Sequence, residues 1–214
     1  MKTYRIILGL LWMGFVIYAL LLAPPDDPAT LELIKNLSLG QWQGVNPSVV
    51  SLFNLMGVWP AVYSCILLTD GHNQWVKAWP FVVASFGLGA FALLPYLILR
   101  SPNDTVIGDP DWVLRITNSR WIAGVLLMIT VGLGAYGFSQ GDWGNFTLQW
   151  QTNRFIHVMG LDFCLLALLF SVLVPDDLIR RKTRQGIWLR AIAAIPLLGA
   201  ILYLLFRPPL TQDQ

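Results

Sequence analysis

Long apolar runs separated by short polar segments dominate the hydropathy pattern of this 214-residue chain. A membrane-spanning helix needs roughly 20 predominantly apolar residues. Six runs satisfy this condition and predict spanning helices over residues 6–23, 49–69, 79–99, 121–138, 155–174 and 187–206. The segments between them are short. We therefore expect an all-α fold, a single polytopic membrane helix bundle over residues 1–214 with about six transmembrane helices.

The segment after the first run departs from this pattern. Three prolines at positions 24, 25 and 28 end the first helix, and Leu31, Ile34 and Leu37 then recur at helical spacing. This pattern predicts a short amphipathic helix on the membrane surface. The first run also resembles a signal peptide, but it is long for one and two prolines follow the cleavage position, so we expect a retained anchor.

The amino-acid composition also indicates a protein that is surrounded by lipid. Charged residues make up 12% of the chain, whereas soluble domains carry about 25%. Most of the ten tryptophans lie near the ends of the predicted spans, where the membrane–water interface favours indole rings. The net charge of +2 is ordinary for a membrane protein and does not indicate nucleic-acid binding. Cys65 and Cys164 fall inside apolar runs and are expected to be packing residues rather than a disulfide.

Lysine and arginine counts give an expected orientation. With six spans, the termini share one side with loops two and four, and this side holds five basic residues. The other three loops hold nine, including the cluster at residues 180–184. The positive-inside rule then places that cluster in the cytoplasm or stroma and both termini outside. Lys2 and Arg5 conflict with this orientation, because they favour an inside N-terminus.

Short sequence echoes indicate an internal repeat. Residues 54–57 resemble residues 157–160, residues 88–90 match residues 198–200, and the third and sixth spans both end at an arginine, Arg100 and Arg207. Three spans in each half would give halves of inverted topology, an architecture common in transporters. Chance similarity in a chain rich in Leu, Gly and Ala is the alternative.

Polar groups inside spans are costly in lipid and are therefore the candidate functional residues. His157 lies in the fifth predicted span, three residues after Arg154, so both occupy one helix face. Asp162 lies deeper in that span and points elsewhere, so it needs a partner on another helix or must be held in its neutral form. Asn54 in the second span is a polar partner of the right type.

Three interpretations of His157 and Asp162 remain open. They form interhelical hydrogen bonds that hold the bundle together, or His157 binds a tetrapyrrole metal such as chlorophyll magnesium, or Asp162 lies on a proton or ion path. The sequence lacks the three or four ligands that zinc needs, and His72, the other histidine, is in a loop. It carries no nucleophile elbow or phosphate-binding loop. We therefore expect no catalytic residues and no metal site.

Three stretches carry a family resemblance: residues 53–60 (FNLMGVWP), 92–96 (ALLPY) and 154–163 (RFIHVMGLDF). The chain resembles an uncharacterised membrane-protein family of cyanobacteria and chloroplasts over spans two to five. The resemblance implies a thylakoid or plasma-membrane location and supplies no site residues.

These observations together predict a non-enzymatic accessory, assembly or pigment-associated factor of a photosynthetic membrane. Its expected partners are the lipid bilayer and a membrane protein complex, with chlorophyll or carotenoid as candidate cofactors. The alternative is a transporter of small molecules or ions. A transporter should have a polar cavity at Asn54, Asp162 and the spans broken at Pro60 or Pro196, whereas an accessory protein should have a dry core and an apolar outer groove.

Overall fold

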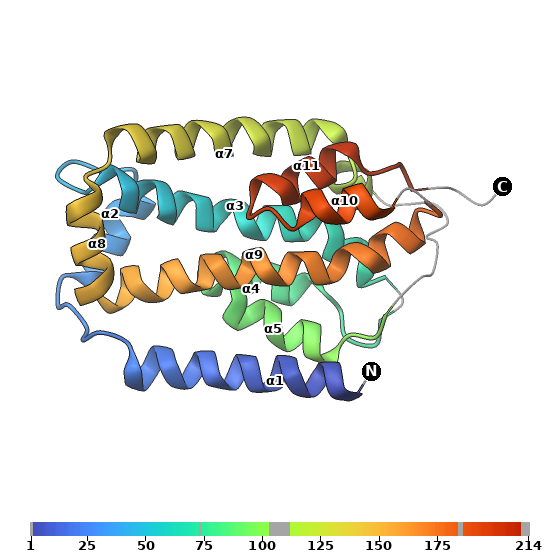
Figure 1. Ribbon diagram of the computed structural model, residues 1–214, viewed down its shortest axis with the longest axis horizontal. Helices are drawn as coiled ribbons and strands as arrows, with labels where there is room; N and C mark the ends of the chain where they lie inside the picture. The colour runs from blue at the N-terminus through green and yellow to red at the C-terminus, as the bar shows by residue number, and fades with distance from the viewer. Residues whose placement is uncertain (1, 73, 103–111, 184–185, 211–214) are drawn as a thin grey trace.

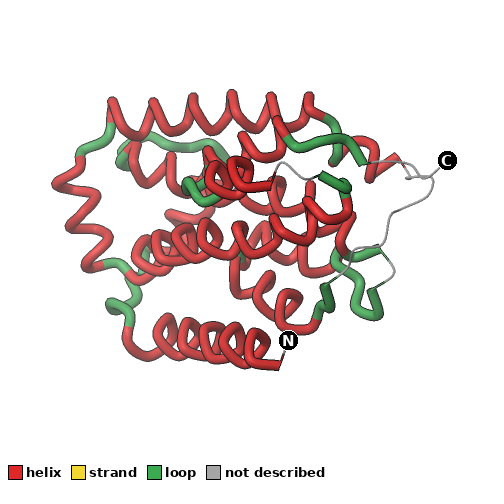
Figure 2. The backbone as a smooth tube through the Cα atoms, turned by 45° about the vertical axis from the view of Figure 1, so that its right-hand side comes forward, coloured by secondary structure: helices red, strands yellow, loops and turns green. Residues whose placement is uncertain are grey.

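The computed structural model describes residues 2–72, 74–102, 112–183 and 186–210, and these residues form helices joined by loops without any strand (Figures 1 and 2). Within this described part, four helices are long and apolar enough to cross a membrane. They are α1 (Lys2–Ile17, continued by a π-helical turn at Tyr18–Leu22), α3 (Pro47–Asp70), α7 (Arg120–Gln140) and α9 (Arg154–Arg180). Four of the six predicted spans therefore appear as continuous helices.

The other two predicted spans, 79–99 and 187–206, are wrong as single helices. Each is broken into two short helices, α4 (Trp79–Leu88) with α5 (Ala90–Leu99), and α10 (Gly186–Ala193) with α11 (Leu198–Phe206). The first break is at Gly89, whose φ of +51° suits a residue without a Cβ. The second break covers residues 194–197; it contains Pro196, which lacks the N–H of a continuing helix, and Leu197, which has a φ of +53°.

Both broken segments are hairpins that enter and leave at the same end of the bundle (Figure 1). Arg100, directly after α5, binds Asp70 at the end of α3, so the hairpin returns to the level from which the chain left α3. Arg207, directly after α11, likewise binds Asp177 near the end of α9. A helix of ten residues is only about 15 Å long, so each hairpin reaches the middle of the bundle and turns back.

The chain consists of two halves with the same order of elements. The half from α1 to α5 matches the half from α7 to α11, with α2 (Thr30–Ser38) corresponding to α8 (Trp143–Thr152). In each half the final helix packs against the first helix of its own half, α5 on α1 and α11 on α7. It also contacts the long helix of the other half, α5 on α9 and α11 on α3. The expected internal repeat is therefore present.

The expectation that the halves are inverted is wrong, because α3 and α9 run in the same direction (Figure 1). Phe53 and Phe155 face each other near the starts of these helices, and Asp70 and Arg180 are hydrogen-bonded at their ends. Each half contains two long helices and one returning hairpin. Two long helices bring the chain back to the end of the bundle where it started, so the second half repeats the first in the same orientation.

The short amphipathic helix predicted after the first span is present as α2. Leu37 is the buried residue of α2 and packs with Val49 and Val50 of α3. The side chain of Leu31, by contrast, is 81% exposed. A second short helix that the sequence analysis did not predict, α8, lies at the same end of the molecule (Figure 1). A third, α6 (Trp112–Thr117), precedes α7 at the opposite end.

Small residues bring α3 and α7 together. Ser51 donates a hydrogen bond of 2.7 Å to the carbonyl of Leu133, and Ser48 donates one of 3.1 Å to the carbonyl of Gly137. A Cβ at Gly137 would lie 2.4 Å from that of Ser51, so glycine is required for this approach. The other glycines of α7, at positions 124, 132 and 134, face open space.

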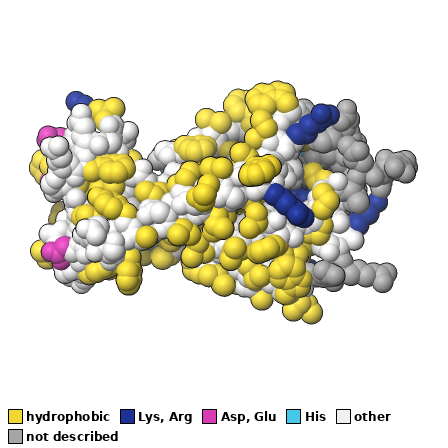
Figure 3. All heavy atoms as spheres, turned by 90° about the horizontal axis from the view of Figure 1, so that it is seen from above, with side chains coloured by type: hydrophobic (Ala, Val, Ile, Leu, Met, Phe, Trp, Pro, Cys, Tyr) yellow, Lys and Arg dark blue, Asp and Glu magenta, His cyan; other side chains and the backbone are white. Residues whose placement is uncertain are grey.

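The basic residues gather at one end of the molecule. The start of α1, the α3–α4 turn, the α9–α10 turn and the end of α11 all lie at one end, which carries nearly all the described lysines and arginines. Among the described residues, only Lys35 and Arg154 are basic at the opposite end; Arg184 lies outside the described residues. Figure 3 shows hydrophobic side chains over the middle of one face, with the Lys and Arg side chains mainly toward one end and the Asp and Glu side chains at the other. The expected grouping, with the termini opposite the 180–184 cluster, is therefore wrong.

Candidate functional site

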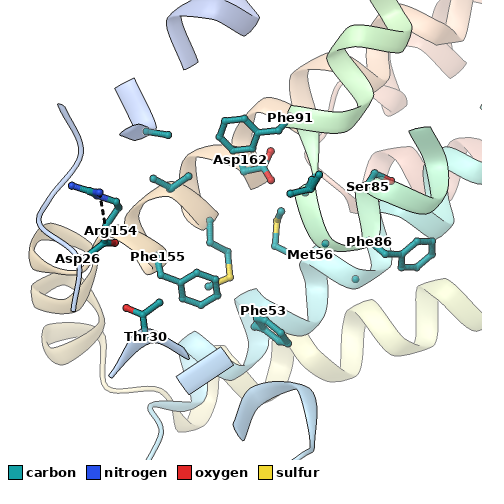
Figure 4. A pocket seen from close by; sticks show the side chains of 17 residues that line it. Asp26, Thr30, Phe53, Met56, Ser85, Phe86, Phe91, Arg154, Phe155 and Asp162 are labelled. Atoms are coloured by element: carbon teal, nitrogen blue, oxygen red, sulfur yellow. Dashed lines mark hydrogen bonds and ion pairs between the residues drawn. The ribbon is translucent and has the colours of Figure 1, made fainter. Parts of the chain in front are cut away.

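A cavity of about 410 Å³ lies between α1, α3, α9 and the turn of the α4–α5 hairpin (Figure 4). Apolar and aromatic side chains supply most of its wall. It extends from Asp26, Thr30 and Arg154, at the end of the bundle where α2 and α8 lie, to Asp162 at the hairpin turn. Its lining residues are Ala19, Asp26, Thr30, Phe53, Met56, Gly57, Ser85, Phe86, Gly87, Leu88, Gly89, Phe91, Arg154, Phe155, Val158, Met159 and Asp162.

Asp162 forms the inner end of the cavity. One carboxylate oxygen, Oδ1, accepts a hydrogen bond of 2.8 Å from the backbone N–H of Ala90, the first residue of α5. The residue is only 5% exposed, and its second oxygen, Oδ2, accepts no hydrogen bond from the residues that the structure describes. A Cβ at Gly89 would lie 1.8 Å from Oδ2, so the hairpin turn meets the carboxylate through bare backbone. The expected partner on another helix is therefore a backbone group.

The last turn of α4 forms the wall beside this carboxylate. Ser85, Phe86, Gly87 and Leu88 all line the cavity. The final carbonyl groups of a helix lack partners within that helix and carry its negative partial charge. The cavity therefore meets the negative end of α4, whereas Asp162 already occupies the first N–H of α5.

Arg154 and Asp26 lie at the opposite end of the cavity (Figure 4). The Arg154 guanidinium donates to the Asp26 carboxylate at 3.0 Å and to the carbonyl of Pro24 at 2.9 Å. The Asp26 side chain is 70% exposed. This ion pair connects the segment after α1 with the first turn of α9. It also forms one wall of the cavity opening.

His157 has both ring nitrogens engaged. A carbonyl only accepts, so Nδ1 carries a proton and donates to the carbonyl of Trp150 at 2.8 Å. In the neutral ring Nε2 then accepts from the hydroxyl of Tyr18, also at 2.8 Å. The imidazole lies against the Trp150 ring, with centroids 4.3 Å apart. This arrangement favours the interhelical hydrogen-bond interpretation and leaves no lone pair for a tetrapyrrole metal.

Asn54 does not join Asp162 at the cavity. Its side-chain amide donates to the carbonyl of Val50, one turn earlier in the same helix, at 2.8 Å. The neighbours of Asn54 in the chain, Phe53, Met56 and Gly57, line the cavity instead. Of the four candidate residues, the structure therefore brings Asp162 and Arg154 to one cavity, places His157 beside it, and leaves Asn54 outside.

A second cluster, which the sequence analysis missed, consists of buried ion pairs at the basic end. Asp70 accepts hydrogen bonds from Tyr96 at 2.9 Å and from Arg100 at 2.7 and 2.6 Å. Burial alone would lower the pKa of Arg100, but its hydrogen bonds and attraction to Asp70 and Asp176 outweigh that effect and raise the pKa above its ordinary value.

The second half repeats this cluster. Asp177 accepts from Tyr203 at 2.6 Å, from Arg207 at 3.2 Å and from Arg181 at 2.9 Å. Asp70, Tyr96 and Arg100 are each separated from Asp177, Tyr203 and Arg207 by the same number of residues. That constant spacing is the signal in the sequence that could have identified both clusters and the true register of the repeat.

Among the described residues, no group of three or more His, Cys, Asp or Glu side chains is placed to hold a metal ion. Cys65 and Cys164 are free thiols, the first buried and the second exposed.

Comparison with known proteins gives no relative for this chain. No protein-family model matches it, and neither a curated protein nor a solved structure shows significant similarity.

Proposed function

We propose that this chain is an integral membrane protein that binds and carries a small molecule. The proposed membrane placement has α1, α3, α7 and α9 as spans and the two hairpins as re-entrant segments. Its support is the length and hydropathy of these four helices together with the apolar side chains exposed between two polar ends (Figure 3). A re-entrant hairpin is tolerated in lipid where protein buries its irregular turn or where the turn lines a cavity, as Gly89 does.

In the proposed orientation the basic end, with both termini, faces the cytoplasm or stroma. The positive-inside rule supports it, because nearly all the described lysines and arginines are at that end. Lys2 and Arg5, which conflict with the six-span arrangement, agree with this one. The acidic end, where the cavity opens, then faces outward.

The proposal that the protein carries a small molecule rests on the cavity. Its volume of about 410 Å³ lies within the range of small-molecule sites, roughly 300–1,000 Å³. It ends halfway through the bundle at the break between two short helices, a position where secondary transporters bind substrates. Between the inner end of the cavity and the cytoplasmic end of the bundle lie the buried ion pairs of Asp70 with Arg100 and Arg180. These ion pairs close the protein on that side. In the proposed orientation the cavity reaches the outer end at Asp26, Thr30 and Arg154 and stops short of the cytoplasmic end.

Cysteine labelling tests the cavity. In a background with Cys65→Ala and Cys164→Ala, Val158→Cys places a thiol at the cavity wall. Leu166→Cys places one in the fully buried core of the same helix as a matched control. A membrane-impermeant thiol reagent added from outside is expected to modify position 158 and spare position 166. Equal protection of both positions in the folded protein would reject an outward-open cavity.

A second test fills the cavity. Gly57 lines it, and a Cβ there meets no atom within 4 Å, so Gly57→Leu adds side-chain volume to the cavity from a position with room for the first carbon. The variant is expected to fold normally and to lose labelling at position 158.

An accessory role in a photosynthetic membrane is the second candidate. The resemblance of residues 53–60 and 154–163 to a cyanobacterial and chloroplast family supports it, with a thylakoid or plasma-membrane location. One structural feature also favours it: α7 turns Gly124, Gly132 and Gly134 toward open space, where a partner helix can approach closely. Gentle purification from native membranes, followed by absorbance and mass spectrometry, would identify a bound complex or pigment, and Gly132→Leu should release a partner docked on α7.

A further inference from the structure

We propose that the cavity binds a monovalent organic cation, an ammonium with an apolar body, and that the ammonium lies against Asp162. The inference rests on the proposed function, because it names the chemical class of the ligand for the same cavity.

The first support is that the Asp162 carboxyl group has no cationic partner in the described part of the chain. Its only hydrogen-bond donor among the described residues is the N–H of Ala90, and no lysine, arginine or histidine in the described chain neutralises it. Arg154, the basic residue at the cavity, is occupied by Asp26 and Pro24. A buried carboxylate without a cationic partner is costly, and a ligand that brings the positive charge removes that cost.

The second support is the polarity of the helix ends at the hairpin turn. The positive end of α5 is occupied by Oδ1 of Asp162, so it does not offer a site to an anion. The cavity is lined instead by the last turn of α4, whose carbonyl groups carry negative partial charge. Oδ2 and this helix end therefore present two negative groups to the same space.

The third support distinguishes an organic cation from a metal ion. Calcium takes six to eight oxygen ligands, and magnesium requires an octahedral set, whereas Asp162 is the only carboxylate at the inner end of the cavity. The remaining wall includes Phe53, Phe91 and Phe155, whose ring faces attract cations and also pack against hydrocarbon. Such a wall suits an ammonium that carries an alkyl or aryl group.

The mouth of the cavity agrees with this assignment. The described residues at that end carry Asp26, Asp27, Glu32 and Asp142 against the two bases Lys35 and Arg154. An acidic rim raises the local concentration of cations and repels anions.

The structure of the second half offers an internal comparison. Leu55 occupies the position in α3 that corresponds to Asp162 in α9, by the same spacing that relates the two Asp–Tyr–Arg clusters. The second half therefore supplies a carboxylate at this position and the first half an apolar side chain, so the cation site belongs to one half only.

Calorimetric titration of the purified full chain in a neutral detergent tests the proposal with three probes of one shape. These probes are 2-phenylethylammonium, 2-phenylethanol and 3-phenylpropionate. Asp162→Asn keeps an oxygen that accepts from Ala90 and removes only the charge. Lys77→Gln removes a charge from an exposed position at the opposite end of the molecule, outside the cavity and its rim, and is the control.

The expected result is saturable binding of the ammonium to the wild type and to Lys77→Gln. Its affinity should fall by about 10-fold or more in Asp162→Asn, as for loss of a hydrogen bond to a charged group. The alcohol should bind the wild type more weakly by a similar factor, and the carboxylate should not bind. Gly57→Leu should abolish ammonium binding.

Two results would overturn the inference. If ammonium and alcohol bind equally, are unaffected by Asp162→Asn and are both lost in Gly57→Leu, the cavity binds small molecules but not through charge. If neither probe binds the folded wild type saturably, both the cation site and the proposed carrier function fail.

Discussion

The guanidinium of Arg180 donates a hydrogen bond of 2.8 Å to the carboxylate of Asp70 and so joins the end of α9 to the end of α3. The same guanidinium lies 3.6 Å from the carboxylate of Asp177. Arg180 thereby connects the Asp–Tyr–Arg cluster of one half to that of the other. All three side chains are almost completely buried.

Removing Arg180 is expected to destabilise the protein strongly. Arg180→Met leaves two buried carboxylates with fewer positive partners, and breaking a buried ion pair costs about 3 kcal/mol or more. Asp26→Asn, which breaks the exposed pair with Arg154, should cost less than about 1 kcal/mol. The free energy of unfolding in mixed micelles, followed by tryptophan fluorescence, measures both. Similar losses in the two variants would contradict a structural role for the buried clusters.

The proposed orientation predicts opposite accessibility for two exposed lysines. Lys77 lies in the α3–α4 turn and Lys35 in α2, at opposite ends of the molecule. In the background without native cysteines, Lys35→Cys should react with an impermeant reagent in intact cells, and Lys77→Cys only after permeabilisation. The reverse pattern would invert the orientation, and labelling of both from outside would reject four spans.

Gly89 is expected to tolerate no side chain. Gly89→Ala forces a Cβ into the Asp162 carboxylate and holds alanine at a φ of +51°, a strain of about 1–3 kcal/mol before the clash is counted. Gly87→Ala is the matched control, because that glycine is helical and a Cβ there meets nothing within 4 Å. Thermal unfolding should show a lower midpoint for the first variant and an unchanged or higher one for the second. Equal midpoints would mean that the hairpin turn adjusts freely.

The hydrogen bond between Tyr18 and His157 should act as a local tie between α1 and α9. A double-mutant cycle with Tyr18→Phe and His157→Leu is expected to give a coupling energy of about 0.6 kcal/mol, the average for interhelical hydrogen bonds in a membrane protein. Unfolding free energies of the four variants supply this value. A coupling near zero, with pigment lost from the native-membrane preparation of His157→Leu, would restore the tetrapyrrole interpretation.

The sequence predicted the helical segments well because hydropathy is a local property. Residues 49–69 and 155–174 are apolar over a full span and form α3 and α9. Residues 79–99 are equally apolar, but hydropathy alone does not show whether a helix continues through Gly89. Gly89 has a positive φ and lies against Asp162, which is distant in the chain.

The candidate site was predicted in part for a similar reason. Asp162 stood out because a carboxylate within an apolar run is conspicuous on its own. Asp70, Arg100 and Arg180 did not stand out, because each lies at the end of an apolar run, where charged residues are ordinary. Only the return of both hairpins to the same end brings these residues together and buries them.

The amino-acid sequence by itself determined that the chain is helical and apolar, since both follow from composition and from runs of neighbouring residues. The tertiary structure decided the number of continuous long helices and the parallel relation of the two halves. It also decided the pairing of Asp162 with the N–H of Ala90. These features depend on contacts between residues far apart in the chain, and local hydropathy carries no information about such contacts.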